Sequence, residues 1–149
     1  MYGLLIDDPK LNFASSHFIV EHDKCEHLHG HNYTVEVELM GSLDKDRMVI
    51  DFKKAKDRVK ALCDNLDHSV LLPGKSKALT ITETNGQIEV KLAEKFYSFP
   101  KEDCTILPTL ATTAEELAAY FYRELKKTLP QLTKVYIAES EGSKAFYSD

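Results

Sequence analysis

The sequence predicts an α+β fold in which a mainly antiparallel sheet carries two helices on one face. Two hydrophobic patterns support this prediction. Apolar and polar residues alternate at 33–39 and 134–140, which is typical of half-buried strands. At 51–66 and at about 113–127 the apolar residues recur three and four positions apart, which is typical of helices that pack against a core. The resulting order is strand, strand, helix, hairpin, helix, strand, as in α+β domains.

The strands come from three parts of the chain. Residues 11–17 have an extended pattern around Phe13, and residues 1–5 are expected to contribute to the same strand. The strand at 33–39 is expected to end at Gly41. Residues 78–83 and 87–92 flank Asn85-Gly86, a dipeptide that favours the tight turn of a β-hairpin.

Both helices carry start signals. Asp51 can cap the first helix with its side chain, and the expected core-facing positions of that helix are Phe52, Ala55, Val59 and Leu62. The second helix begins with Thr113 and has Glu116 three residues later, which is the pattern of a capping box. Pro130 lies beyond its end.

Composition limits the possible functions. A chain of 149 residues with 43% hydrophobic and 29% charged residues is expected to form one globular domain, residues 1–149. A net charge of −5 argues against a nucleic-acid partner. Asp7 and Asp8 lie where a signal peptide would be apolar, and no apolar run approaches a membrane span. Three scattered cysteines suggest no disulfide framework, so the sequence predicts a cytoplasmic protein with reduced thiols.

Five of the six histidines lie between positions 17 and 31. His29 and His31 are two residues apart on an extended chain, so their side chains share a face. His17 ends the preceding strand, and an antiparallel neighbour can bring all three imidazoles together. Three neutral imidazoles suit Zn²⁺ and leave its fourth position open, as in catalytic zinc sites.

Plainer interpretations compete with this one. A histidine at a strand end is often an ordinary hydrogen-bonded residue, which is the expectation for His22 and His27. Cys25 beside a cation would have a lowered pKa, and its charged neighbours argue against the alternative of a buried, inert thiol. Asp67 can orient His68 for proton transfer, although adjacent Asp-His pairs are also common in loops.

Six motifs in order along the chain resemble those of the 6-pyruvoyl-tetrahydropterin synthase and 6-carboxy-tetrahydropterin synthase family. They are Phe13-Ala14-Ser15-Ser16-His17, Cys25-x-x-x-His29-Gly30-His31, Val49-Ile50-Asp51-Phe52, Leu66-Asp67-His68, Thr113-Ala114-Glu115 and Ala138-Glu139-Ser140. The main departure is the stretch 74–108, which is longer than the compact bacterial members need.

The resemblance implies the tunnelling fold (T-fold), here with a four-stranded antiparallel sheet, two helices on one face and an inserted hairpin. It also implies a homo-hexamer built as a dimer of trimers, with active sites between subunits. The residue roles that it implies are Zn²⁺ ligation by His17, His29 and His31, general base catalysis by Cys25, a proton relay through Asp67 and His68, anchoring of the pterin ring by Glu139, and support of the pocket by Thr113 and Glu115.

The implied reaction converts 7,8-dihydroneopterin triphosphate with loss of triphosphate. The complete set of Cys25, Asp67 and His68 favours 6-carboxy-5,6,7,8-tetrahydropterin, a precursor of deazapurine nucleosides such as queuosine. The pyruvoyl product for biopterin remains an alternative. Glu26 beside Cys25 keeps open a branch that cleaves the side chain to 6-hydroxymethyl-dihydropterin. Two hypotheses from other classes are a non-catalytic zinc-containing pterin-binding module and a zinc-stabilised interaction domain.

Overall fold

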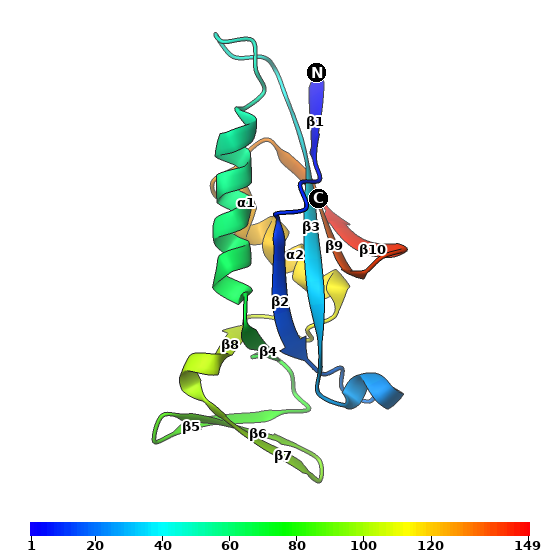
Figure 1. Cartoon of the computed structure of the whole chain (residues 1–149), viewed down its shortest axis with the longest axis vertical. Helices are drawn as coiled ribbons and strands as arrows, with labels where there is room; N and C mark the ends of the chain where they lie inside the picture. The colour runs from blue at the N-terminus through cyan, green and yellow to red at the C-terminus, as the bar shows by residue number, and fades with distance from the viewer.

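The computed structural model describes residues 1–149 as a large sheet, a smaller sheet and two helices (Figure 1). The strands of the large sheet are β1 (Tyr2–Ile6), β2 (Asn12–His17), β3 (His29–Gly41), β4 (Ser69–Pro73), β8 (Cys104–Leu107), β9 (Leu132–Ser140) and β10 (Ser143–Ser148). The small sheet contains β5 (Thr80–Thr84), β6 (Gln87–Leu92) and β7 (Lys95–Pro100). The helices are α1 (Phe52–Leu66) and α2 (Ala114–Lys126), with short 3-10 helices η1 (Asp23–Glu26) and η2 (Lys101–Asp103).

The large sheet is mainly antiparallel and has the strand order β10-β9-β3-β2-β4-β8, with β1 also paired to β3. Only the pairs β2–β4 and β4–β8 are parallel. The α+β class is therefore confirmed, but the sheet has seven strands rather than the predicted four. The strands missing from the prediction are β4, β8 and β10, which are four to six residues long.

Residues 1–5 do not join the strand at 11–17, so that expectation was wrong. β1 pairs with the far end of β3, from Tyr2 opposite Gly41 to Ile6 opposite Val37. β2 pairs with the near end of β3. Residues 9–10 form a turn between β1 and β2. In this turn the backbone amide of Lys10 donates to the Asp8 carboxylate at 2.9 Å. Both strands therefore lie along the same edge of β3.

The two helices pack on one face of the large sheet (Figure 1). On that face Tyr33, Val35, Val37 and Leu39 of β3 are buried in the main core. Asp51 caps α1 by accepting from the amides of Lys53 and Lys54, as predicted. The buried stripe of α1 consists of Ala55, Val59, Cys63 and Leu66. Phe52 is 55% exposed, contrary to expectation, because it lies at the open first turn of the helix. Thr113 caps α2 by accepting from the Glu116 amide at 3.3 Å, also as predicted.

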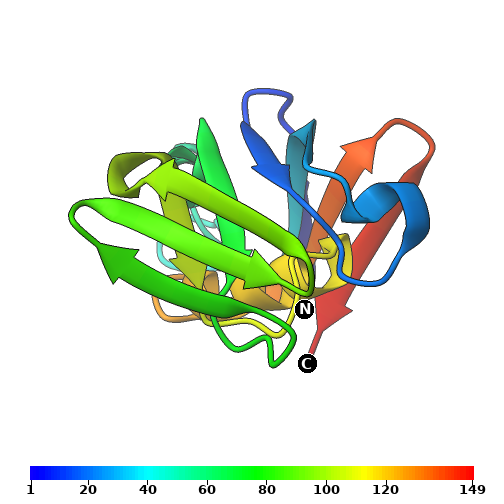
Figure 2. The same ribbon diagram turned by 90° about the horizontal axis from the view of Figure 1, so that it is seen from below.

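The predicted hairpin forms, and a third strand extends it into a separate sheet (Figure 2). Asn85 and Gly86 both have positive φ at the β5–β6 turn. The small sheet has its own core, composed of Phe18, Leu72, Leu79, Ile88, Val90 and Leu92. Since Phe18 directly follows β2, this core attaches the small sheet to the end of the large one. Neither helix of the fold is long and apolar enough to cross a membrane.

Candidate active site

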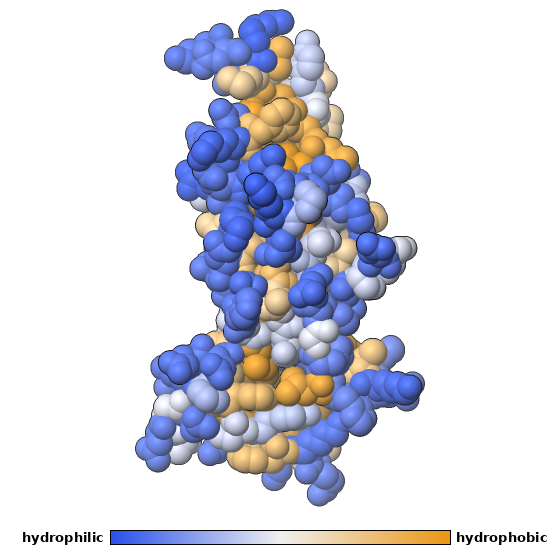
Figure 3. Space-filling model, viewed as in Figure 1, coloured by the Kyte–Doolittle hydropathy of each residue, from blue (hydrophilic) through white to orange (hydrophobic).

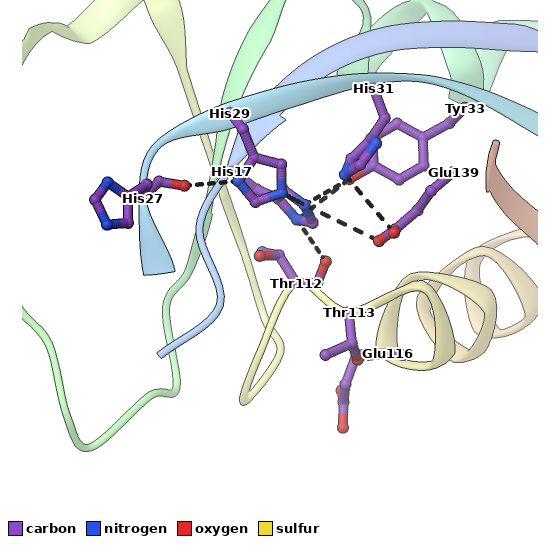
Figure 4. Close-up of polar contacts among 9 residues, drawn as sticks. All are labelled: His17, His27, His29, His31, Tyr33, Thr112, Thr113, Glu116 and Glu139. Atoms are coloured by element: carbon purple, nitrogen blue, oxygen red, sulfur yellow. Dashed lines mark hydrogen bonds and ion pairs between the residues drawn. The ribbon is translucent and has the colours of Figure 1, made fainter. Parts of the chain in front are cut away.

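The pairing of β2 with β3 brings the three predicted histidines together. His17 lies opposite His29 in the antiparallel register, and Ser15 lies opposite His31. All three imidazoles are therefore on the helix-covered face of the sheet (Figure 4). One ring nitrogen from each lies within 4.8 Å of the others, so the group can hold a metal ion.

Backbone carbonyls set the tautomers of two of these imidazoles. The Nδ1 atom of His17 lies 2.9 Å from the carbonyl oxygen of Thr112, and that of His29 lies 2.6 Å from the carbonyl oxygen of His27. A carbonyl oxygen can only accept, so both Nδ1 atoms carry the hydrogen and donate it. The Nε2 lone pairs are left for a ligand, and such carbonyl contacts commonly orient metal-binding histidines.

The Nε2 atoms have the arrangement expected of a metal site. Those of His17 and His29 are 3.1 Å apart, and neither carries a hydrogen to bond the other. The Nε2 atom of His31 is buried and has no hydrogen-bond partner. Tetrahedral zinc with bonds of about 2.0–2.1 Å would place its nitrogen ligands roughly 3.3 Å apart. A cation among these three atoms would satisfy all of them at once.

Burial keeps His17 neutral. Its side chain is only 1% exposed, and desolvation lowers its pKa from 6.5 to about 4, with further lowering by the nearby His29 and His31. The Tyr33 hydroxyl lies 3.2 Å from Nδ1 of His17. Burial raises the pKa of Tyr33 well above its usual range, so this hydroxyl also stays neutral. A neutral imidazole is the form that binds metals.

The low pKa of His17 predicts acid sensitivity of the metal-free protein. The unfolded chain protonates this residue near pH 6.5 and the folded chain only near pH 4, so stability falls as the pH drops between these values. Denaturant titrations should give a loss of about 2 kcal/mol from this group between pH 7 and pH 4.5. The variant His17→Gln should lack this component. An equal loss in that variant would assign the effect to other groups.

Glu139 lies beside the triad and on the apolar face of β9, the face that the alternation along this strand predicted. It shares a face with the fully buried Val135 and Ile137. Its carboxylate oxygens are 3.6 Å from Nε2 of His31 and 4.0 Å from Nε2 of His17 (Figure 4). Both distances exceed a hydrogen bond, so the one-third-exposed carboxylate can accept N–H groups from a ligand.

A cavity of about 420 Å³ opens next to Glu139. Four of the predicted site residues line it, namely Cys25, Thr113, Glu115 and Glu139. Its size suits a small organic molecule. The Cys25 thiol is exposed, whereas Cys63 is buried in the main core.

Glu26, the neighbour of Cys25, does not line this cavity. Its carboxylate forms an ion pair with Lys95 at 3.1 Å and accepts the amide of Glu21 at 2.8 Å. These contacts, Lys95 first, lower the pKa of Glu26. The two predicted site residues of η1 therefore have different surroundings.

Asp67 and His68 lie outside the cavity that Cys25 and Glu139 line. Asp67 accepts the Ala14 amide at 2.8 Å and bonds Nδ1 of His68, also at 2.8 Å, so it orients that ring as predicted. His68 has a positive φ, is 84% exposed and lines a separate cavity of about 530 Å³. His31 of the triad also lines that cavity, together with Ser16 and Asn32.

Three contacts of the site were missing from the sequence analysis. They are the carbonyl groups of His27 and Thr112 and the hydroxyl of Tyr33. Tyr33 continues the alternation of His29 and His31, which is a signal that the sequence contains. The carbonyl of Thr112 comes from a residue 95 positions away from His17, and only the tertiary fold brings it there.

The fold and the site define a class of protein. Three histidines that could hold a metal ion would leave further positions open on it, unlike the four-ligand sites that only stabilise structure. A thiol and a carboxylate share a ligand-sized cavity next to them. This combination is typical of a metal-dependent enzyme that acts on a small molecule.

Comparison with known proteins identifies the family. Residues 9–149 match the 6-pyruvoyl tetrahydropterin synthase family, and the chain belongs to it. A Methanocaldococcus jannaschii protein, provisionally named 6-carboxy-5,6,7,8-tetrahydropterin synthase, is 38% identical over 92% of this chain and 89% of its own. The 6-carboxy-5,6,7,8-tetrahydropterin synthase of Aquifex aeolicus is 32% identical over 85% of this chain and 77% of its own.

Solved structures agree with this family and with the T-fold. The 6-pyruvoyl tetrahydropterin synthase of Plasmodium vivax is 34% identical and has a TM-score of 0.92, covering 99% of this chain and 97% of that one. A second structure of the same enzyme carries alanine in place of a catalytic glutamate. The family and the fold that the six motifs predicted are therefore confirmed.

Proposed function

We propose that the protein converts 7,8-dihydroneopterin triphosphate and water to 6-carboxy-5,6,7,8-tetrahydropterin, and that triphosphate and acetaldehyde are released. One observation carries the proposal: Cys25 shares a cavity with Glu139, whose carboxylate lies 3.6 Å from His31 and 4.0 Å from His17 of the histidine triad. The names of the relatives from M. jannaschii and A. aeolicus support the carboxy product.

We further propose that the metal is Zn²⁺, held by the Nε2 atoms of His17, His29 and His31. Neutral nitrogen donors in a set of three suit zinc, and the fourth position remains for substrate. A bound zinc ion would supply Lewis acidity toward the side-chain hydroxyl groups of the pterin.

The cavity residues have complementary roles in this proposal. Glu139 accepts two hydrogen bonds from the amino and ring N–H groups of the pterin, a pairing that is strong because the acceptor is charged. Thr113 and Glu115 support the ring from the first turn of α2. The Cys25 thiolate removes a proton from a carbon of the substrate side chain, since Cys25 is exposed and lines the cavity.

Glu139→Gln tests recognition separately from chemistry. The amide keeps the shape of the side chain but turns one acceptor into a donor that faces the ring N–H groups. Pterin binding should weaken by roughly 1.5–3 kcal/mol, measured by calorimetry. The metal content should not change. Unaltered affinity would mean that the ring is anchored elsewhere, and loss of metal would make Glu139 a ligand instead.

A second copy of the chain is part of this proposal, because Asp67 and His68 lie outside the cavity of Cys25 and Glu139 within one chain. We propose a homo-hexamer, arranged as a dimer of trimers, in which a neighbouring chain supplies this pair as the proton relay. Apolar surface is exposed at the end of the molecule that carries β1, as expected of a contact surface (Figure 3). The exposed large apolar side chains of β1, of the end of β3 and of the segment that leads into α1 are Tyr2, Leu5, Met40, Met48 and Phe52. The three free cysteines are consistent with a cytoplasmic enzyme.

The second candidate function is side-chain cleavage to 6-hydroxymethyl-dihydropterin. Glu26 beside Cys25 favours it, since the Plasmodium vivax enzyme uses a catalytic glutamate. The pyruvoyl product is a further alternative, in keeping with the family name.

The first test is whether the zinc-loaded protein releases inorganic triphosphate from 7,8-dihydroneopterin triphosphate. Release at a rate that scales with protein supports an enzyme that eliminates triphosphate. Tight pterin binding without release would instead favour the non-catalytic pterin-binding module, and neither binding nor release would favour the interaction domain.

A further inference from the structure

Cys25 and Glu26 are adjacent in η1, but they are held differently. The Cys25 side chain lines the cavity beside Glu139 and is exposed. Both oxygens of Glu26 are occupied: Oε1 lies 3.1 Å from the ammonium group of Lys95, and Oε2 accepts the Glu21 amide at 2.8 Å. Glu21 has a positive φ of 58°, so the loop before η1 bends back toward this carboxylate.

Lys95 belongs to the small sheet, at the start of β7. That sheet is fixed relative to the metal centre through Phe18, the residue after His17, which stacks on Tyr97 with ring centroids 5.3 Å apart. Leu92, at the other side of the β6–β7 turn, is buried in the same core. The Lys95 side chain therefore comes from the first residue of β7 in the small sheet, whose core includes Phe18 and Leu92 (Figure 2).

We propose that Lys95 is a positioning residue that determines which base acts in the cavity, because it holds Glu26 outside and leaves Cys25 to face the substrate. The inference rests on the proposed function, and it assigns a role to the segment inserted at 74–108. Without Lys95, one of the two restraints on the Glu26 carboxylate is lost, and the side chain can rotate toward the cavity.

The two bases lead to different products. Cys25 removes a carbon-bound proton on the way to loss of triphosphate. A carboxylate in its place can take the proton from the hydroxyl of the second side-chain carbon, after which the bond between the first and second carbons breaks. The electron pair passes to the first carbon, which takes up a proton. The products are 6-hydroxymethyl-dihydropterin and glycolaldehyde triphosphate, with no net oxidation or reduction.

The expected effect is a change of product ratio and not a loss of activity. Exposed ion pairs have modest strength, so loss of this one should raise the share of the hydroxymethyl product relative to the triphosphate-elimination product by on the order of fivefold. The ratio is measured in one tube by mass spectrometry, and it does not depend on how much protein is folded.

The experiment compares four variants of the zinc-loaded protein with the wild type. Lys95→Ala should raise the ratio, and Lys95→Arg should restore it. The double variant Lys95→Ala/Glu26→Gln should return to the wild-type ratio, since the competing base is gone. Lys101→Ala is the matched control, because it removes a comparable exposed ion pair to Glu83 at the same sheet. An unchanged ratio in Lys95→Ala, an equal change in Lys101→Ala, or a change that persists in the double variant overturns the inference.

A second readout does not need the proposed reaction. A carboxylate released beside Cys25 disfavours the thiolate, so Lys95→Ala should slow alkylation of Cys25 by iodoacetamide about twofold to fivefold. Peptide mapping separates Cys25 from Cys104. Alkylation should recover in the double variant and remain unchanged in Lys101→Ala. If the wild type releases no triphosphate but the variants show this alkylation pattern, the proposed function is refuted and the role of Lys95 stands. If the alkylation pattern is absent, the role of Lys95 is refuted.

Discussion

Replacement of Cys25 by alanine is expected to abolish turnover and to leave the metal and pterin binding intact. The substitution removes the proton-abstracting group but none of the proposed metal or ring contacts. A positioned base typically contributes 10²–10⁴-fold, so kcat should fall by about that factor. Stopped assays of triphosphate release, with metal analysis and pterin calorimetry on the same sample, measure the three quantities.

Cys104→Ala is the matched control for this variant. Its thiol lies at the start of β8, outside the cavity that Cys25 lines, and it is partly buried. It should retain full turnover. Normal kinetics in Cys25→Ala would move the base role to Glu26 or His68 and would favour the hydroxymethyl-forming branch.

His29→Ala is expected to remove most of the bound zinc and, with it, the activity. His29 supplies one of only three protein donors, and its ring is already oriented by the carbonyl oxygen of His27. Wild-type protein should carry about one zinc per chain. The variant should hold well under a tenth of that after dialysis, with its fold largely intact by circular dichroism.

His27→Ala is the control for the metal prediction. Only the backbone carbonyl of His27 contacts His29, and its ring points away from the site (Figure 4). This variant should keep its zinc. Full zinc occupancy in a triple variant of His17, His29 and His31 would contradict the site.

The triad was predictable because it depends on short-range rules. Side chains two apart on a strand share a face, so His29, His31 and Tyr33 had to point the same way. The same rule put Glu139 on the side of Val135 and Ile137. Their meeting required only two antiparallel pairings, of β2 with β3 and of β3 with β9, and the structure has both.

Other features depend on contacts that no local pattern contains. β4 and β8 are short strands joined to the sheet by parallel pairing, and their register is set by segments far away in the chain. The same applies to the Thr112 carbonyl and to the ion pair of Glu26 with Lys95. The neighbours Asp67 and His68 were expected to serve the site. In a single chain neither of them lines the cavity of Cys25 and Glu139, and His68 lines a second cavity together with His31.

The most direct test of the account is mass spectrometry of the pterin formed from 7,8-dihydroneopterin triphosphate by the zinc-loaded wild-type protein. The account predicts 6-carboxy-5,6,7,8-tetrahydropterin as the main product, with release of inorganic triphosphate and loss of both in Cys25→Ala. Recovery of unchanged substrate, or of 6-hydroxymethyl-dihydropterin as the main product with Cys25→Ala fully active, would contradict it.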